Sequence, residues 1–78
     1  MLKDLRNYIL ENKFEINIYE NNIDIVNYKE IDHFDDNIII IRFEKGIITV
    51  KGNNLIITKL LEDEILINGE IRNIEFRW

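Results

Sequence analysis

The second half of this chain, residues 37–76, is a ladder of short isoleucine-rich stretches in which apolar and polar residues alternate. The breaks between the stretches are Lys45-Gly46, Gly52-Asn53-Asn54 and Gly69. Glycine and asparagine tolerate positive φ and therefore suit tight turns. Isoleucine is β-branched and suits a pleated sheet. The pattern predicts short β-strands joined by tight turns, and hence an all-β fold.

The alternation with a period of two begins at Phe14 and predicts about eight short strands. They span residues 14–19, 23–28, 31–34, 37–43, 47–51, 55–60, 65–68 and 70–77. Short turns separate them, so successive strands should pair as a small antiparallel meander. Gly52-Asn53-Asn54 is predicted to be a turn, and Gly69 a bulge or a bend. The meander could curl into a roll or form a small two-layer sandwich.

The N-terminal residues follow a different period. Leu2, Leu5 and Ile9 fall on one face of a helix, so residues 2–12 are predicted to form a short amphipathic helix. A helix this short must pack on the sheet to persist, and the alternative is a frayed N-terminus. With 78 residues the chain has room for one domain, which we expect to comprise the helix (1–12) and an all-β part (13–78).

One predicted strand is apolar on both faces. Ile39, Ile41 and Phe43 lie on one face of residues 37–43, and Ile38 and Ile40 lie on the other. A strand buried on one side only should alternate. Something is therefore expected to cover the second side, either the N-terminal helix or another subunit.

Association is also expected from size. A chain of 78 residues buries a small core, and without Cys it has no disulfide to supplement that core. We therefore expect a homo-oligomer, with Ile38 and Ile40 as candidate interface residues. Phe76, Arg77 and Trp78 are further candidates, because Trp beside Arg is a common interface anchor.

Charge and hydropathy exclude several classes of partner. The net charge is −5 and the basic residues are scattered, which makes nucleic acid an unexpected partner. The longest apolar run, residues 38–41, is far too short to span a membrane. Residues 1–4 do not resemble the start of a signal peptide. We expect a cytoplasmic protein without a membrane span.

The only histidine offers an alternative function. His33 lies close to Asp32, Asp35 and Asp36, which could form a small metal- or ligand-binding site. The acidic residues lack the spacing of a calcium-binding loop and also suit a tight turn. The chain contains no Ser and no Cys to act as a nucleophile. We therefore expect a protein that is not an enzyme and holds no metal or other cofactor.

Three stretches carry a family resemblance: residues 25–31 with Phe34, residues 46–57 and residues 67–76. In the order and spacing of their glycines and aliphatic residues, residues 23–76 resemble the YabP/YqfC family of sporulation-associated proteins, and the YqfC branch looks closer. The resemblance implies a protein of endospore-forming bacteria that acts in the mother cell, beside a membrane protein as partner. It brings no catalytic motif. The N-terminus departs from the YqfC pattern, which puts in doubt any partner contact made there.

Overall fold

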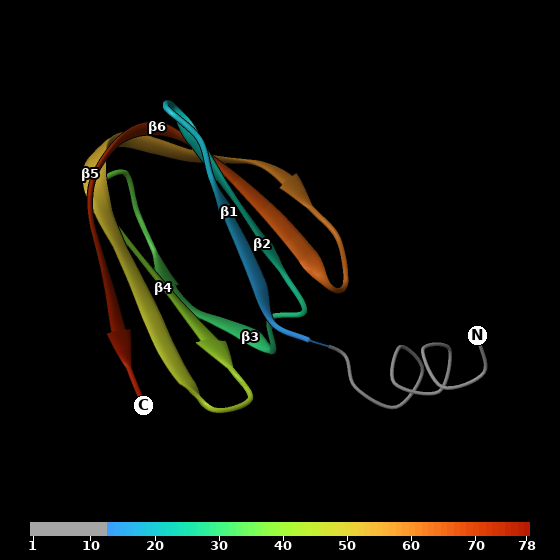
Figure 1. Ribbon diagram of the computed structural model, residues 1–78. Helices are drawn as coiled ribbons and strands as arrows, with labels where there is room; N and C mark the ends of the chain where they lie inside the picture. The colour runs from blue at the N-terminus through green and yellow to red at the C-terminus, as the bar shows by residue number, and fades with distance from the viewer. Residues whose placement is uncertain (1–12) are drawn as a thin grey trace.

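The computed structural model describes residues 13–78. These residues form one six-stranded antiparallel sheet, in the order β1-β2-β6-β5-β4-β3 (Figure 1). The strands are β1 (Glu15–Ile18), β2 (Asn22–Val26), β3 (Glu30–Phe34), β4 (Ile38–Phe43), β5 (Gly46–Leu60) and β6 (Glu64–Arg77). The all-β prediction is confirmed for this part of the chain. The helix predicted over residues 2–12 lies outside the described residues.

The predicted number of strands was wrong because two of the predicted breaks lie inside strands. Gly52-Asn53-Asn54 is part of the 15-residue β5, and Gly69 is part of the 14-residue β6. The register between these two strands shifts at Lys51/Gly52 and again at Asn53/Ile56. Asn54 and Gly69 have positive φ angles of 53° and 136°. The residues that suit a turn here form β-bulges, which bend a strand without ending it.

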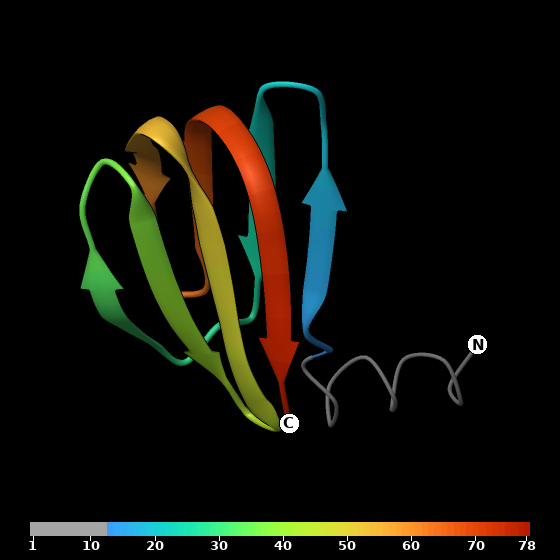
Figure 2. The ribbon, with the colours of Figure 1, turned by 90° about the vertical axis from the view of Figure 1, so that its left-hand side faces the viewer.

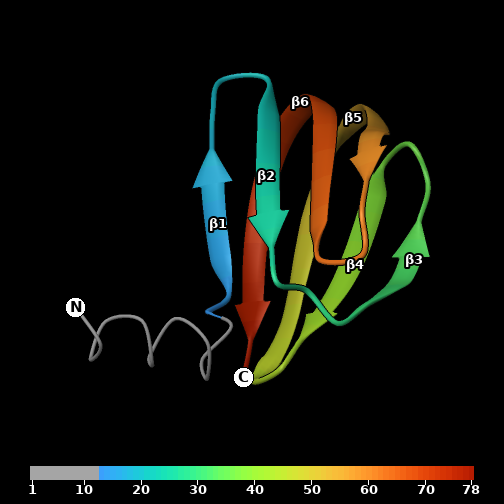
Figure 3. The ribbon, with the colours of Figure 1, turned by 90° about the vertical axis from the view of Figure 1, so that its right-hand side faces the viewer.

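The bends fold the sheet over on itself into two layers, and β5 and β6 run through both (Figures 1, 2 and 3). Layer A consists of β3, β4, residues 46–51 of β5 and residues 70–77 of β6. Layer B consists of β1, β2, residues 64–68 of β6 and residues 56–60 of β5. The two layers are therefore halves of one continuous sheet.

The order of the strands departs from a simple meander at one place. Strands β3 to β6 are neighbours in sequence order, but β2 pairs with β6, and β3 lies at the opposite edge of the sheet. The link between β2 and β3 begins at Asn27, which has a φ of 66°, and its backbone N–H donates to the carbonyl of Asp63. The prediction that successive strands pair was therefore wrong for β2 and β3.

The core lies between the layers and is built from matching rows of aliphatic side chains. In layer B, Ile23 and Ile25 pair with Ile67 and Ile65. In layer A, the corresponding pairs are formed by β4 and β5, namely Ile39 with Val50 and Ile41 with Ile48. All eight side chains are almost completely buried. Since successive side chains of a strand point to opposite faces, this arrangement requires the alternation seen in the sequence.

The two halves of the sheet share an internal pseudo-two-fold arrangement. In each half, a hairpin (β1–β2 or β3–β4) pairs with the first part of a long strand, β6 or β5. In each half, the turn of the hairpin contacts the bend of that strand. The N–H of Gly52 donates to the carbonyl of Asn37, and the N–H of Gly69 donates to the carbonyl of Asn21. The backbone groups exposed by each bend are thus satisfied in the same way.

Candidate functional site

Four aromatic side chains meet at the end of layer A where the chain terminates. Phe14 stacks on Phe43 with ring centroids 3.9 Å apart, and Phe43 meets the edge of Trp78 at 5.6 Å. Trp78 in turn stacks on Phe76 at 5.8 Å. Phe43 is buried, whereas Phe76 is 44% exposed and Trp78 is 82% exposed. We call these four residues the C-terminal aromatic cluster. Its outer half is an exposed apolar surface.

A bulge in β6 determines which side chains join this cluster. Ile65 and Ile67 face the core, so strict alternation would send Ile74 and Phe76 to the outside. Arg72 has no partner in β5, because Lys51 pairs with Asn73 and Gly52 with Ile71. This extra residue resets the alternation and brings Ile74 and Phe76 to the inner face, opposite Val50 and Ile48.

Within the part of the chain that the structure describes, the edge of β6 beside this cluster has no neighbouring strand. Residues 70–77 pair with β5 on one side, and β2 pairs only with residues 64–68 (Figure 2). Among residues 13–78, three further edges lack a neighbour: the outer edges of β1 and β3, and that of residues 56–60 of β5. Unpaired N–H and C=O groups make such an edge a template for a strand from another chain.

The interface residues predicted from the sequence lie on two different faces of layer A. Ile38 and Ile40 are on the outer face, as predicted, and are half-buried. They pair with Lys51 and Thr49 on β5. Arg77 pairs with Ile47 and shares this outer face, whereas Phe76 and Trp78 belong to the inner-face aromatic cluster. The structure therefore does not join the five residues into one surface.

His33 lies in β3, opposite Ile40 of β4 and just before the turn between these two strands. Its Nε2 lies 2.8 Å from Oδ2 of Asp35, and both side chains are half exposed. Oδ1 of Asp35 accepts hydrogen bonds from the backbone N–H groups of Asn37 (2.7 Å) and Ile38 (2.8 Å). These bonds and the contact with His33 lower the pKa of Asp35 to about 2. The carboxylate of Asp35 thus stabilises the turn between β3 and β4.

No three potential metal ligands come together within residues 13–78. Asp32, which the sequence placed beside His33, instead accepts a hydrogen bond from Arg42 at 2.8 Å, and Glu30 binds the same guanidinium at 2.8 Å. A metal-binding function around His33 is therefore not favoured by the structure.

A second group of charged side chains was missed by the sequence analysis. On the outer face of layer B, the carboxyl groups of Asp24 and Glu64 are hydrogen-bonded, and Nζ of Lys59 lies 3.8 Å from Glu64. The bond to Asp24 and the accompanying loss of hydration raise the pKa of Glu64. Oδ1 of Asp24 is buried without a hydrogen-bond partner among the described residues. Nothing local in the sequence indicates this pair, because it depends on the pairing of β2 with β6.

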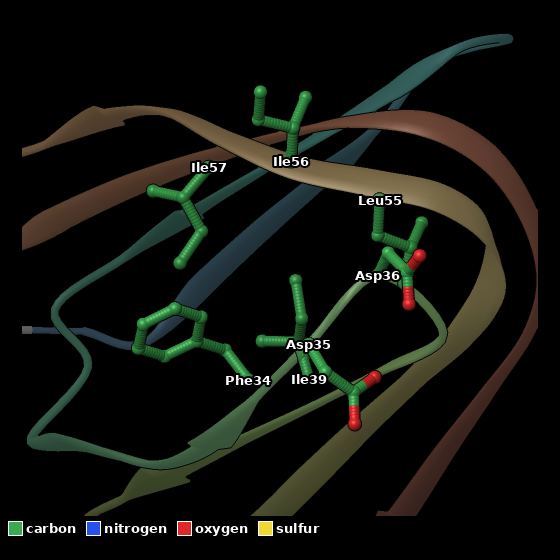
Figure 4. A pocket seen from close by; sticks show the side chains of 7 residues that line it. All are labelled: Phe34, Asp35, Asp36, Ile39, Leu55, Ile56 and Ile57. Atoms are coloured by element: carbon green, nitrogen blue, oxygen red, sulfur yellow. The ribbon is translucent and has the colours of Figure 1, made fainter.

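A shallow apolar pocket of about 310 Å³ lies at the open side between β3 and the second half of β5 (Figure 4). Phe34, which is 64% exposed, forms one wall. The two aspartates of the β3–β4 turn lie at its rim. The lining residues are Phe34, Asp35, Asp36, Ile39, Leu55, Ile56 and Ile57. The pocket forms where this turn meets the bend of β5, since the N–H of Leu55 donates to the carbonyl of Asp36.

Comparison with known proteins identifies a family. The sequence model of the YabP family matches residues 7–77, which is most of the chain. The match does not distinguish the YqfC branch, so that part of the prediction stays a prediction. No curated protein matches the sequence. Within residues 13–78 there is also no helix that is long and apolar enough to cross a membrane.

Proposed function

This chain belongs to the YabP family, and this membership indicates a role in sporulation. We propose that it is a non-enzymatic interaction protein. In this proposal the protein self-associates and binds a membrane-anchored protein of the sporulation machinery. It acts in the cytoplasm of the mother cell of an endospore-forming bacterium. The family likeness supports this role because it brings no catalytic motif.

The observation that carries the proposal is the exposed half of the C-terminal aromatic cluster, beside a strand edge that has no neighbour among residues 13–78. Trp78 is 82% exposed although its ring contacts both Phe43 and Phe76. Tryptophan is enriched among residues that dominate binding energy, because it offers a large rigid surface at a small entropic cost. The neighbouring edge of β6 supplies backbone donors and acceptors. Together they suit binding by strand addition with an aromatic anchor.

The proposal is tested by sedimentation of the purified full chain with membranes from sporulating cells of an endospore-forming bacterium that encodes it. We expect the protein to bind these membranes, and to bind them at least tenfold less after they are treated with protease. It should not bind protein-free vesicles. Trp78→Ala should weaken membrane binding at least tenfold, because a protein that no longer self-associates loses the avidity of several copies for the membrane. Phe34→Ala removes another exposed aromatic ring, on the pocket side, and should bind normally. Equal binding to protein-free vesicles, or none to any membrane, would contradict the proposed partner.

A further inference from the structure

The four unpaired edges of the described sheet are not equivalent. The edge of β3 is interrupted by a bulge between Ile31 and His33, and the second half of β5 by another between Ile57 and Lys59. Strand β1 has only four residues. By contrast, β6 pairs with β5 without a shift from Asn73 to Arg77. A regular, unblocked edge is the best template for an added strand, so β6 is the edge most suited to pairing.

The side chains of residues 74–78 divide cleanly between two faces. Ile74 and Phe76 stand opposite the buried Val50 and Ile48, so they face inward, and Trp78 joins them through the aromatic cluster. Glu75 and Arg77 stand on the outer face, opposite Thr49 and Ile47. The end of β6 therefore presents an apolar row and, on its reverse side, one carboxylate and one guanidinium two residues apart.

Residues 74–78 are complementary to a second copy of themselves in an antiparallel strand pair. With a two-fold axis at Phe76, Glu75 of each strand stands opposite Arg77 of the other, and Ile74 stands opposite Trp78. Opposite charges placed directly across a strand pair stabilise it, and like charges destabilise it. An axis at Glu75 would oppose two carboxylates, and an axis at Arg77 two guanidinium groups. An axis at Ile74 would oppose Glu75 to Asn73 and form no ion pair.

We propose that a second copy of this chain adds to the free edge of β6 in this register, with residues 74–78 of both copies paired antiparallel around Phe76. The contact is isologous, so it closes as a dimer. It joins the two copies of layer A into one continuous sheet and covers Trp78 with Ile74 of the partner subunit. Arg77, which has no carboxylate within ion-pair distance among residues 13–78, gains one. This inference rests on the proposed function, because it identifies the contact through which the chain self-associates.

Charge reversal in the full chain tests the register. Light scattering and sedimentation over a concentration series should give twice 9.5 kDa for the wild type. Glu75→Arg and Arg77→Glu should each raise the dissociation constant at least tenfold, because each places like charges opposite one another. The double variant Glu75→Arg/Arg77→Glu should restore the dimer to within about threefold of the wild type, because it exchanges the two partners of each ion pair.

Matched controls separate this contact from a general effect of charge. Glu70→Arg and Arg72→Glu change the net charge by the same amounts on the same strand, outside the paired residues, and should leave the dimer intact. Circular dichroism establishes that each variant is folded. If both single reversals leave the dimer unchanged, or the double reversal does not restore it, the register is wrong.

Disulfide trapping gives an independent measurement, because the chain has no natural cysteine. Residues directly opposite in an antiparallel pair have Cα atoms about 5 Å apart, within the range of a disulfide. Phe76→Cys should therefore form a linked dimer on oxidation, whereas Glu75→Cys and Arg77→Cys should not. A wild-type chain that stays monomeric to several hundred micromolar would overturn the inference. If such a monomer still binds membranes, the proposed membrane-anchored partner is supported although the dimer is not. Failure of the dimer is therefore distinguishable from failure of the proposed function.

Discussion

At the scale of single residues, Asp35 combines a conformational and an electrostatic role. Its carboxylate accepts two backbone N–H groups and contacts His33, and these contacts lower its pKa to about 2 from 3.8. The charged form is therefore favoured in the folded state. Its contribution to stability is present above pH 3.8 and is lost as the pH falls through about 2.

We expect Asp35→Asn to remove this acid dependence. An asparagine oxygen can still accept both backbone hydrogen bonds, so the turn is retained while the titrating group is lost. Urea unfolding followed by circular dichroism should show the wild-type midpoint falling more steeply than that of the variant between pH 3.8 and pH 2. Asp36→Asn is the control and should follow the wild type. If the urea midpoints of the wild type and of Asp35→Asn fall equally with pH, Asp35 is not the source of the acid dependence.

Glu64 should act in the opposite direction. Its pKa is raised above the ordinary value of 4.5, chiefly by the hydrogen bond with Asp24, so the folded state binds the proton more tightly than the unfolded chain. This contribution to stability is present below pH 4.5 and is lost as the pH rises through the folded-state pKa. Glu64→Gln should therefore reduce the difference in unfolding midpoint between pH 4 and pH 7. Glu44→Gln, at an exposed position, should leave this difference unchanged. A similar reduction in both variants would contradict a specific role of the Asp24–Glu64 pair.

At the scale of elements, the bends of β5 and β6 explain what the sequence could and could not predict. The alternation around Ile48, Val50 and Ile67 was interpreted correctly because it is local and its period is two. Gly52-Asn53-Asn54 was misinterpreted as a turn because a bulge and a turn need the same residues with positive φ. What distinguishes them is the strand on the other side, and local sequence does not show that strand.

Substitutions at the bends should be costly. A Cβ atom at Gly69, whose φ is 136°, would lie 2.7 Å from the carbonyl oxygen of Asn54, and one at Gly52 would clash with the carbonyl oxygen of Glu70. We expect Gly69→Ala and Gly52→Ala each to lower the free energy of unfolding by about 1–3 kcal/mol, measured by urea titration. Asn54→Gly at the same bend should change it by less than about 1 kcal/mol, because glycine adopts positive φ without strain. If neither Gly69→Ala nor Gly52→Ala lowers the free energy of unfolding, the bends can straighten without loss of stability.

At the scale of the whole molecule, the candidate site depends on contacts that the sequence does not display. Phe76, Arg77 and Trp78 were identified as an anchor from their residue types alone, and the structure places Trp78 between Phe43 and Phe76. That they lie at an edge without a neighbour in the described sheet follows from β2 pairing with the first part of β6 and not with β3. Local propensity cannot determine such a pairing, because strands far apart in sequence compete for the same neighbour on equal local terms.

The passage of β5 and β6 through both layers has a consequence for how the molecule opens. Neither layer can detach without removing two strands from the other, so the protein should unfold as one cooperative unit. Native-state hydrogen exchange should then give Ile25 in layer B and Ile41 in layer A the same opening free energy, equal to that of global unfolding. A lower value for one layer would reveal a separable unit. Folding should also be slow for a chain of this size, because the pair Ile23–Ile67 closes a loop of about 44 residues before the core is complete.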